Sequence, residues 1–343
     1  MAARTVLGNS ERCIGCVIQL PKRTNSMSET IALERKLKLK FFNQETLIKG
    51  KPAQVECVEI GGQSFAITKG PLTMVRLEDE WYEDVNDPSA VIDALKERSR
   101  VNPDILTFWQ RVPEIKPKYP YYMEWESLAV LPIKSFDYWW HKQVKGTTRN
   151  MIRKSQKMGV EVRQVAFDDD LVRGMTDIFN ETPVRQGKSF WHYGKNFETV
   201  KRQFSRFLFR EETIGAYYQG ELIGFAMVAD AGRYAVIGQF ISKLKHRDKA
   251  TNNAMMAKTV EVCEKRQLPY LIYTTWIDSS LVDFKRHSGF QEMRVPRYFV
   301  PLTRKGKLAL KLGLHRGWKA TLPDRIKRLL KKLRKSWHGF RGE

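Results

Sequence analysis

The sequence predicts an α+β protein whose C-terminal half is a mixed sheet flanked by helices. The first observation behind this prediction is a succession of three apolar, β-branched segments joined by short glycine-containing connections, which is typical of antiparallel strands. The three segments are Thr213–Tyr218, Glu221–Ala229 and Arg233–Ile241. The second observation is a change of period after them, to the spacing of a helix, followed by strand, helix and strand. The predicted order is therefore β-β-β-α-β-α-β.

The elements after the three strands begin with a helix. Asn252 or Asn253 is its expected N-cap, and apolar side chains fall on one side of it until it ends near Gln267. The remaining elements are a buried strand, a short helix and a last strand, at Tyr270–Trp276, Ser280–His287 and Gln291–Leu302.

The residues before the three strands predict a long helix, a strand and two further helices. The long helix is expected over Phe136–Met158 and ends at Gly159. Its aromatic start is expected to anchor it in the core, and its basic second half either to face solvent or to contact a phosphate. The other elements are expected at Val160–Val165, Asp170–Glu181 and Phe197–Arg210.

A smaller α+β unit is predicted over Lys40–Pro132. Gly61 and Gly62 separate two apolar segments there and are a strong hairpin signal. The elements of this unit are strands at Gln54–Ile60 and Gln63–Thr68, a helix at Ser89–Ser99 after Pro88, and strands at Ile105–Gln110 and Trp125–Pro132. The expected organisation is an N-terminal extension (1–39), the small domain (40–135), a larger domain (136–303) and a basic tail (304–343). Translation could begin at Met1 or at Met27.

The chain has 343 residues and a net charge of +22, much of it in the C-terminal segment. Residues 304–343 contain 14 Lys and Arg against 2 acids. Such a charge predicts a polyanionic partner or an anionic membrane surface, or else a solubilising tail. The sequence has no apolar run of about 18 residues, so we expect a cytoplasmic protein, either free or peripheral on the inner membrane face. Four cysteines make no disulfide framework in a chain of this size.

We expect no metal site at Cys13 and Cys16, and we expect buried thiols at Cys57 and Cys263. Residues 321–337 predict an amphipathic helix with basic residues around one apolar stripe. The stripe consists of Leu322, Ile326, Leu329, Leu330, Leu333 and Trp337. This pattern is typical of a helix that lies on an anionic membrane. The alternatives are docking of the stripe on the protein's own core and binding of RNA.

The segment Glu181–Lys195, between two predicted helices, has the densest set of functional side chains. Arg185 beside Gln186 combines a planar cation with an amide, which suits a carboxylate or a phosphate. His192 is the group there that titrates near neutrality. Further candidate substrate contacts are Lys188, Trp191, Tyr193 and Lys195. The alternative is an ordered connection whose aromatic side chains merely cover the sheet edge.

Three short motifs stand out in the C-terminal half. They are Thr147–Lys154 running into Gly159–Val162, Asn252–Met256 at the start of the central helix, and Phe284–Lys285 before Gly289–Phe290. Together with the order β-β-β-α-β-α-β, they resemble the acyl-CoA N-acyltransferase (GNAT) superfamily. The resemblance is to its Fem-like branch, whose aminoacyl transferases add amino acids to peptidoglycan precursors. It covers about half of the chain, from Phe136 to Leu302.

The resemblance implies a GNAT-like fold and an enzyme that moves an acyl or aminoacyl group onto an amine. The implied acceptor is a cell-envelope or polysaccharide precursor at the inner membrane surface. The small domain is then either a reduced first GNAT-like copy or a separate accessory domain. The reaction requires a deprotonated amine, aligned reactants and a stabilised oxyanion, but no covalent enzyme intermediate.

Lys285, in the Phe-Lys motif, supplies positive charge to the developing oxyanion in this interpretation, or else is a surface lysine of a helix. The candidate general bases are His192, Glu181 and Asp278. Asp278 follows a strand that ends in Tyr273 and Trp276, and ligand crevices commonly open at such strand ends. We therefore expect these two aromatic residues to contact the substrate.

One departure from the family pattern concerns the donor. Acetyl-CoA enzymes of this fold usually hold the pyrophosphate with an Arg/Gln-x-x-Gly-x-Gly/Ala loop, whereas Lys243–Asn253, in that place, has no glycine. The candidate phosphate contacts there are Lys243, Lys245, Arg247 and Asn252. The expected donor is an acyl-CoA or an aminoacyl-tRNA. The alternative function is a non-catalytic GNAT-like module that binds RNA or an anionic membrane.

Overall fold

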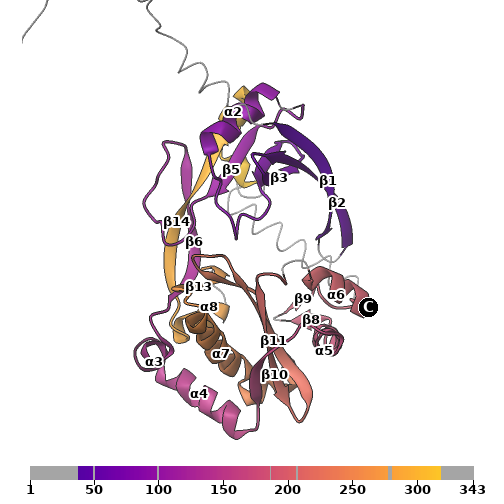
Figure 1. The fold of residues 1–343 in the computed structure, drawn as a ribbon, viewed down its shortest axis with the longest axis vertical. Helices are drawn as coiled ribbons and strands as arrows, with labels where there is room; N and C mark the ends of the chain where they lie inside the picture. The colour runs from indigo at the N-terminus through magenta and orange to yellow at the C-terminus, as the bar shows by residue number, and fades with distance from the viewer. Residues whose placement is uncertain are drawn as a thin grey trace, which may run out of the picture. The chain divides into compact units, whose positions relative to one another are not determined.

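A large mixed sheet is the centre of the structure, a computed structural model that describes residues 38–48, 51–98, 100–185, 187–205, 208–276 and 280–317 (Figure 1). The strands are β1 (Leu39–Ile48), β2 (Lys51–Ile60), β3 (Gln63–Thr68), β4 (Met74–Leu77), β5 (Ile105–Trp109), β6 (Met123–Pro132), β7 (Glu161–Val165), β8 (Val184–Arg185), β9 (Lys188–Ser189), β10 (Glu211–Tyr218), β11 (Glu221–Asp230), β12 (Ala235–Ser242), β13 (Tyr270–Thr275) and β14 (Gln291–Pro301). The α-helices are α2 (Pro88–Arg98), α3 (Phe136–Tyr138), α4 (Gly146–Lys157), α5 (Asp169–Asn180), α6 (Phe197–Phe204), α7 (Thr251–Lys265), α8 (Ser280–His287) and α9 (Arg304–Lys311).

The described strands, apart from the small β8–β9 ribbon, form one sheet in the order β1-β2-β3-β4-β5-β14-β6-β13-β12-β11-β10-β7. This mixed sheet with flanking helices confirms the predicted α+β class and the order β-β-β-α-β-α-β from β10 to β14. Because β14 lies between β5 and β6, the sheet continues from the small predicted domain into the larger one. The described residues belong to a unit that starts at Leu37. The domain boundary near residue 135 stays a prediction.

The hairpin between β2 and β3 confirms the signal of the paired glycines. Gly61 and Gly62 have φ angles of +58° and +78°. Residues with a side chain adopt such angles only at a cost, so glycine favours this tight turn. The next helix, α2, begins at Pro88, one residue before the predicted Ser89, and its Leu95 is buried in one cluster with Phe65 of β3.

The long helix predicted over Phe136–Met158 is interrupted. A π-helical stretch at Trp139–Gln143 follows α3, and Val144 and Lys145 are extended before α4 begins. Trp139 explains the interruption, since its indole N–H donates a 2.8 Å hydrogen bond to the carbonyl oxygen of Ser288 and its side chain is fully buried. The aromatic start is therefore the core anchor that was predicted. The later helix α6 ends at Phe204, before the predicted Arg210.

The predicted N-cap of the central helix α7 is wrong. Ala250 precedes the helix in a left-handed conformation, with φ of 53°, and no side chain caps it. The residues before Ala250, Leu244–Lys249, form a 3-10 helix. Because this tighter helix runs almost directly into α7, Asn252 and Asn253 lie inside the first turn instead of ahead of it.

Helices cover both faces of strands β10 to β12. On one face, α7 packs against all three strands and α4 packs against α7 (Figure 1). Met256 and Val260 of α7 are buried there with Ile237 of β12. On the other face, α5 packs against β11 and against α6, and Phe179 is buried with Phe225. The strands are thus enclosed between two helical layers.

Some predictions fall on residues that the structure does not describe. They concern the N-terminal extension with Cys13 and Cys16, and the amphipathic tail at 321–337. Cys57 and Cys263 are buried free thiols, as predicted. In the described part of the chain, no helix combines the length and the apolarity needed to cross a bilayer.

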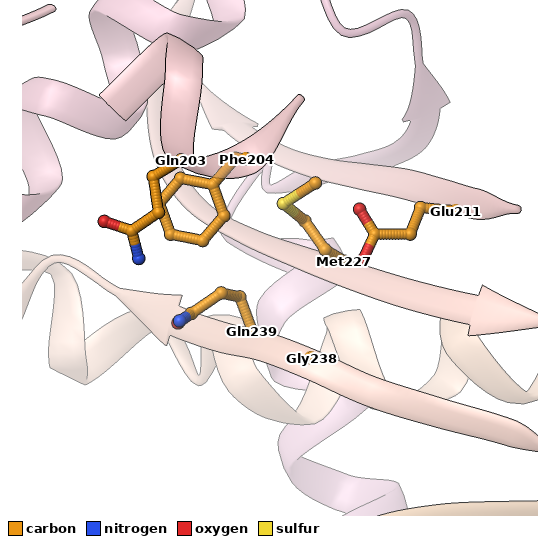
Figure 2. Close-up of a pocket in the computed structure, with 6 residues that line it drawn as sticks. All are labelled: Gln203, Phe204, Glu211, Met227, Gly238 and Gln239. Atoms are coloured by element: carbon orange, nitrogen blue, oxygen red, sulfur yellow. The ribbon is translucent and has the colours of Figure 1, made fainter. Parts of the chain in front are cut away.

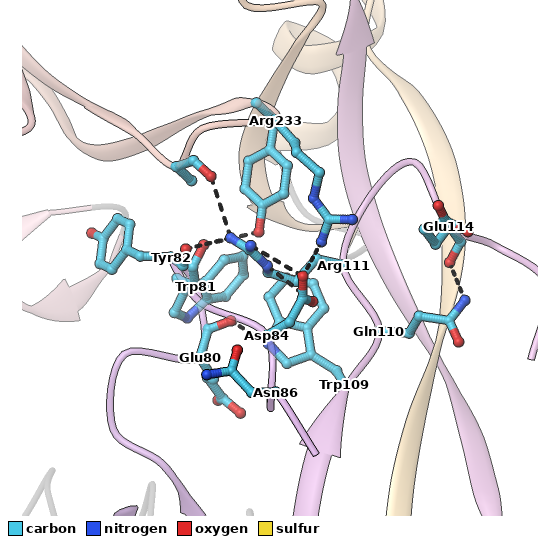
Figure 3. A network of polar contacts seen from close by, with 12 residues as sticks. Glu80, Trp81, Tyr82, Asp84, Asn86, Trp109, Gln110, Arg111, Glu114 and Arg233 are labelled. Carbon is cyan, nitrogen blue, oxygen red and sulfur yellow. Dashed lines mark hydrogen bonds and ion pairs between the residues drawn. The ribbon is translucent and has the colours of Figure 1, made fainter. Parts of the chain in front are cut away.

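A buried arginine joins distant parts of the sheet. Figure 3 shows the guanidinium of Arg111, which follows β5, beside the carboxylate of Asp84, with Nη2 donating to Oδ2 at 3.2 Å. Asp84 also pairs with Arg233, in the connection between β11 and β12. The side chain of Arg111 is 8% exposed. Burial lowers its pKa, but the hydrogen bond and the charge of Asp84 outweigh burial and raise it.

We expect Asp84→Ala to lower the free energy of unfolding by about 1–3 kcal/mol, because it leaves the buried Arg111 cation without its carboxylate. Chemical denaturation measures this change. Asp93→Ala, which removes an exposed carboxylate of α2, is the matched control and should cost less than about 0.5 kcal/mol. Equal effects of the two substitutions would contradict the role given to Asp84.

Candidate functional site

The sheet opens between β12 and β13. The two strands pair in parallel only at Ala235–Leu271 and Val236–Ile272. Beyond this point β13 is deflected at Thr274, whose φ is +52°, where its pairing with β6 is also irregular. From Ile237 to Ser242, β12 has no partner on this side among the described strands. Such a free edge can form hydrogen bonds with an extended ligand.

Lys285 of α8 lies beside this opening. The residue is only 2% exposed, and its Nζ donates a 2.8 Å hydrogen bond to the carbonyl oxygen of Thr275, at the end of β13. The same Nζ lies 5.0 Å from the centre of the Tyr273 ring. Burial lowers the pKa of Lys285. The alternative of a surface lysine is therefore excluded, and α8 holds a desolvated ammonium at the opening.

Aromatic side chains fill the space between the diverging strands. The ring centre of Phe240, on β12, is 5.6 Å from that of Tyr273 and 6.0 Å from that of Phe284. Trp276 packs against the same apolar cluster. The predicted substrate contacts Tyr273 and Trp276 thus lie near Lys285.

A cavity of about 150 Å³ lies on the opposite face of β12, below α6 (Figure 2). It is lined by Gln203, Phe204, Glu211, Met227, Gly238 and Gln239. In Figure 2, Gln203 and Phe204 come from α6, and Gly238 and Gln239 from β12. Glu211 has no hydrogen-bond or ion-pair partner among the described residues. Burial raises the pKa of Glu211 to about 7.

Sequence analysis missed Glu211 because the predicted strand began at Thr213, whereas β10 begins at Glu211. The available signal was a pair of glutamates directly before an apolar run. The second of them, Glu212, pairs with Arg266 and accepts a hydrogen bond from Gln164. The first, Glu211, is a half-buried carboxyl because α6, which ends at Phe204, and β12, which lies further along the chain, pack around it.

His192 belongs to the core between α5 and α6. It is 3% exposed, stacks on Phe179 with ring centres 4.1 Å apart, and its Nδ1 lies 3.1 Å from Nζ of Lys195. Burial, and then the charges of Lys195 and Arg185, lower the pKa of His192 to about 3. Burial also lowers the pKa of Lys195 to about 8. His192 is therefore neutral near pH 7, and Lys195 connects it to Gln203 of the cavity through a 2.6 Å hydrogen bond.

Arg185 and Glu181 fasten the end of α5 to the end of β12. Nη2 of Arg185 lies 2.9 Å from the carboxylate of Glu181, and Nη1 donates to the carbonyl oxygen of Ser242 at 2.8 Å. Glu181 also accepts from the backbone N–H groups of Leu244 and Lys245, at 2.7 and 2.9 Å. Both oxygens of Glu181 are thus engaged, which leaves this carboxylate little capacity to accept a proton from a substrate.

The predicted phosphate contacts differ in their surroundings. Lys243 is buried and pairs with Glu221, and Lys245 pairs with the same carboxylate at 2.7 Å. Arg247 is exposed and has no ion-pair partner among the described residues. Asn252 lies in the first turn of α7, a turn with no acidic residue. A helix start without an acid or a side-chain cap favours an anion.

The remaining predicted residues either lie on the surface or are residues that the structure does not describe. Trp191 and Tyr193 are 48% and 47% exposed, and Lys188 is exposed on β9. Gln186 and Asp278 fall outside the described residues. The structure therefore gathers the predicted residues into separate groups. These are Lys285 with Tyr273 and Trp276, His192 with Lys195 and Trp191, and Arg185 with Glu181.

Comparison with solved structures finds similar folds. A structure described as the crystal structure of FemX matches 79% of this chain and 90% of its own, with a TM-score of 0.53 and 12% identity. L-PGS from Bacillus licheniformis matches 71% of this chain and 82% of its own, with a TM-score of 0.49 and 13% identity. The C-terminal domain of a putative lysylphosphatidylglycerol synthetase from Agrobacterium fabrum matches 84% and 91%, with a TM-score of 0.49 and 13% identity.

No protein-family model matches the chain, and no curated protein matches it. At such low identities, the similarity to FemX shows the fold alone. The chain therefore has a GNAT-like fold of the kind found in FemX.

Proposed function

We propose that the protein is a transferase that moves an acyl or aminoacyl group onto an amine. The observation that carries this proposal is the free edge of β12, with a buried ammonium near one face and a half-buried carboxyl without a side-chain partner among the described residues near the other. The ammonium is Lys285, whose neighbour Phe284 contacts Phe240 of β12. The carboxyl is Glu211, which lies beside Gly238. Gly238 and Phe240, the residues of β12 that these two groups adjoin, are two positions apart, which is about 7 Å along a strand.

The proposed reaction is a direct attack of the acceptor amine on the carbonyl carbon of the donor. The ammonium of Lys285 stabilises the oxyanion that develops on the carbonyl oxygen. Glu211, as the carboxylate, accepts the proton that the amine loses. The bond from the carbonyl carbon to the donor's oxygen or sulfur then breaks with its electron pair on that atom, which takes up the proton held by Glu211, and an amide and the free donor carrier leave.

Glu211 is the general base that we prefer, because the other described candidates are engaged elsewhere. His192 is buried and hydrogen-bonded to Lys195. Glu181 accepts from Arg185 and from two backbone N–H groups. Asp278, outside the described residues, stays a prediction.

The donor that we propose is an acyl-CoA or an aminoacyl-tRNA with its phosphates near the start of α7. Arg247 and Asn252 would contact these phosphates, and Lys243 and Lys245 would add positive charge while paired with Glu221. The segment lacks the glycines that let backbone amides approach a pyrophosphate closely. The contact would therefore depend more on side-chain cations.

The acceptor that we propose is an amine of a cell-envelope or polysaccharide precursor, met in the cytoplasm at the inner membrane face. This part of the proposal rests on the Fem-like motifs. The exposed residues of the connection between α5 and α6 would contact the acceptor, whereas the buried ones would position them. The exposed residues are Lys188, Trp191 and Tyr193, and the residues that would position them are the half-buried Arg185 and the buried Lys195. Gln186, which the structure does not describe, stays a predicted contact.

A second candidate function is a non-catalytic module that binds RNA or an anionic membrane. The glycine-free segment Lys243–Asn253 favours it, since a basic segment of this kind binds phosphates without any need for catalysis. Turnover of a bound donor would exclude it.

We expect Lys285→Met to lower kcat/KM for amide formation by about 100-fold, because the oxyanion loses its cation. The assay follows release of free CoA or free tRNA, using the donor that most raises the melting temperature in a screen of acyl-CoA thioesters and charged tRNAs. Lys142→Met, at an exposed lysine, is the matched control and should keep full activity. Full activity in Lys285→Met would disprove the proposed site.

The pKa of Glu211 predicts a pH dependence of both rate and stability. The rate should rise with pH through about 7, and Glu211→Gln should abolish this rise. The folded state keeps the proton of Glu211 up to a pH of about 7, whereas the unfolded state releases it from about 4.5 upward. This proton uptake stabilises the folded state; the stabilisation is complete at low pH and is lost as the pH approaches 7. Glu211→Gln should therefore gain about 1–3 kcal/mol of stability over wild type on going from pH 5 to pH 8.

Urea denaturation at the two pH values measures this stability difference. Glu161→Gln, at an exposed carboxylate of β7, is the control, and its difference from wild type should not change between the two pH values. If the difference for Glu211→Gln is equally constant, the carboxyl is not desolvated as described.

We expect Arg247→Ala to weaken donor binding by about tenfold, because one charge-assisted contact to phosphate is lost. Titration calorimetry with CoA and with tRNA measures the affinity and shows which carrier depends on this residue. Arg173→Ala, at an exposed arginine of α5, controls for the loss of general positive charge. Unchanged affinity of Arg247→Ala for both carriers would contradict the proposal that the donor's phosphates lie near the start of α7.

A further inference from the structure

The helix α9, which contains none of the residues proposed for the reaction, presents two neighbouring stripes to solvent. Leu308 and Leu312 are one turn apart and are 57% and 58% exposed. Leu314, in the short 3-10 helix that follows, is 40% exposed. Beside these leucines, Arg304, Lys307 and Lys311 recur at helical spacing, and all three are exposed. We call these six residues the α9 surface.

An apolar hollow adjoins the α9 surface. It measures about 460 Å³ and lies between α9 with its following 3-10 helix and the connection from β3 to β4. Its apolar lining includes Pro71, Leu72, Met74 and Ala309, together with Leu308 and Leu314. The volume is about three times that of a cavity of roughly 150 Å³ that takes up benzene in another protein. The hollow is therefore large enough for a hydrocarbon segment.

The positive charge next to this hollow is only partly neutralised. Lys69 and Lys305, also in its lining, pair with Glu56 and Asp104. In contrast, the three basic residues of the α9 surface have no ion-pair partner among the described residues. The sequence beyond Gly317, the last described residue, adds nine Lys and Arg against two acids. Among the described residues, the apolar patch is therefore bordered by unpaired positive charge.

Exposed leucines and unpaired cations on one helix face match one kind of partner best. RNA phosphates would be recognised by the cations alone and would leave the leucines in water. An anionic bilayer takes both, because its acyl region receives the leucines and its headgroups receive the basic residues. We propose that the α9 surface docks the protein on an anionic lipid bilayer. This docking does not require that the protein be a transferase.

The test is sedimentation of the full-length protein with vesicles of phosphatidylglycerol and phosphatidylcholine, compared with phosphatidylcholine alone. Wild type should bind the anionic vesicles, and more weakly at high salt. Leu308→Ser/Leu312→Ser should weaken binding by about tenfold or more, because the inserted apolar area is lost. Lys307→Glu/Lys311→Glu should weaken it as strongly, because two attractions become repulsions.

The matched control is Ile115→Ser, at an apolar residue 49% exposed and next to Lys116. This variant should bind like wild type. The melting temperature of each variant is measured in parallel. The leucine pair is already exposed, so its replacement should leave the melting temperature unchanged.

Several outcomes would overturn the proposal. One is wild type that fails to bind anionic vesicles. Another is the leucine variant binding like wild type while the charge-reversed variant does not, since this would show a purely electrostatic surface of the kind that RNA uses. A third is a leucine variant with a lower melting temperature and full binding, which would mean that the leucines pack on the chain itself, including its segment after Gly317.

If the leucine variant loses both stability and binding, Leu308→Trp decides. Tryptophan is favoured at the membrane interface, so binding to anionic vesicles should become stronger. Unchanged or weaker binding of Leu308→Trp would overturn the proposal.

Discussion

The position of the last strand is the constraint on which the rest of the sheet depends. β14 lies between β5 and β6 and pairs antiparallel with both. Arg297 of β14 stabilises this position, since its guanidinium pairs with Glu80 and with Glu126 and its side chain is only 18% exposed. Burial lowers the pKa of Arg297, but the two carboxylates outweigh burial and raise it. β14 thus joins two groups of strands in one sheet. One group is β1 to β5, and the other is β6, β13, β12, β11, β10 and β7.

The opening between β12 and β13 follows from this order of strands in the sheet. β13 stays paired with β6 through Ile272, where the register breaks, while β12 stays paired with β11 as far as Ser242. Each strand thus follows its outer neighbour, and the two separate from each other. Unpaired backbone groups in a sheet are costly unless something satisfies them. Arg185 satisfies one carbonyl at the end of β12, and an extended ligand would satisfy others.

The sequence predicts the elements whose signals are local. Gly61 and Gly62 mark their hairpin by themselves, and the change of period after β12 separates strand from helix without reference to the fold. The start of α7 was mispredicted, because the conformation of Ala250 depends on the preceding 3-10 helix. Glu211 was missed for a related reason, since its desolvation depends on how α6 and β12 pack around it.

The candidate site shows the same limit. The position of Lys285 in a motif, and of Tyr273 and Trp276 at a strand end, led to side chains that do lie near one another. The roles of the residues in the connection between α5 and α6 were predicted from the chemistry of their side chains alone. Some of their partners are distant in sequence, as with Glu181 and the backbone of Leu244, or Arg185 and the carbonyl oxygen of Ser242. Tertiary packing decides whether such a side chain is exposed to solvent or buried against another part of the chain. The chemistry of the residue itself does not predict this.

The central position of β14 has a consequence for folding of the protein during translation. Glu80 and Arg297, which meet in the sheet, are 217 residues apart in the chain. While translation proceeds between them, β5 and β6 each present a bare edge to the cytosol, and such edges invite pairing with other nascent chains. Closure of the sheet has to wait for nearly the whole polypeptide, so yield in the cell should depend on how well chaperones shield these early strands.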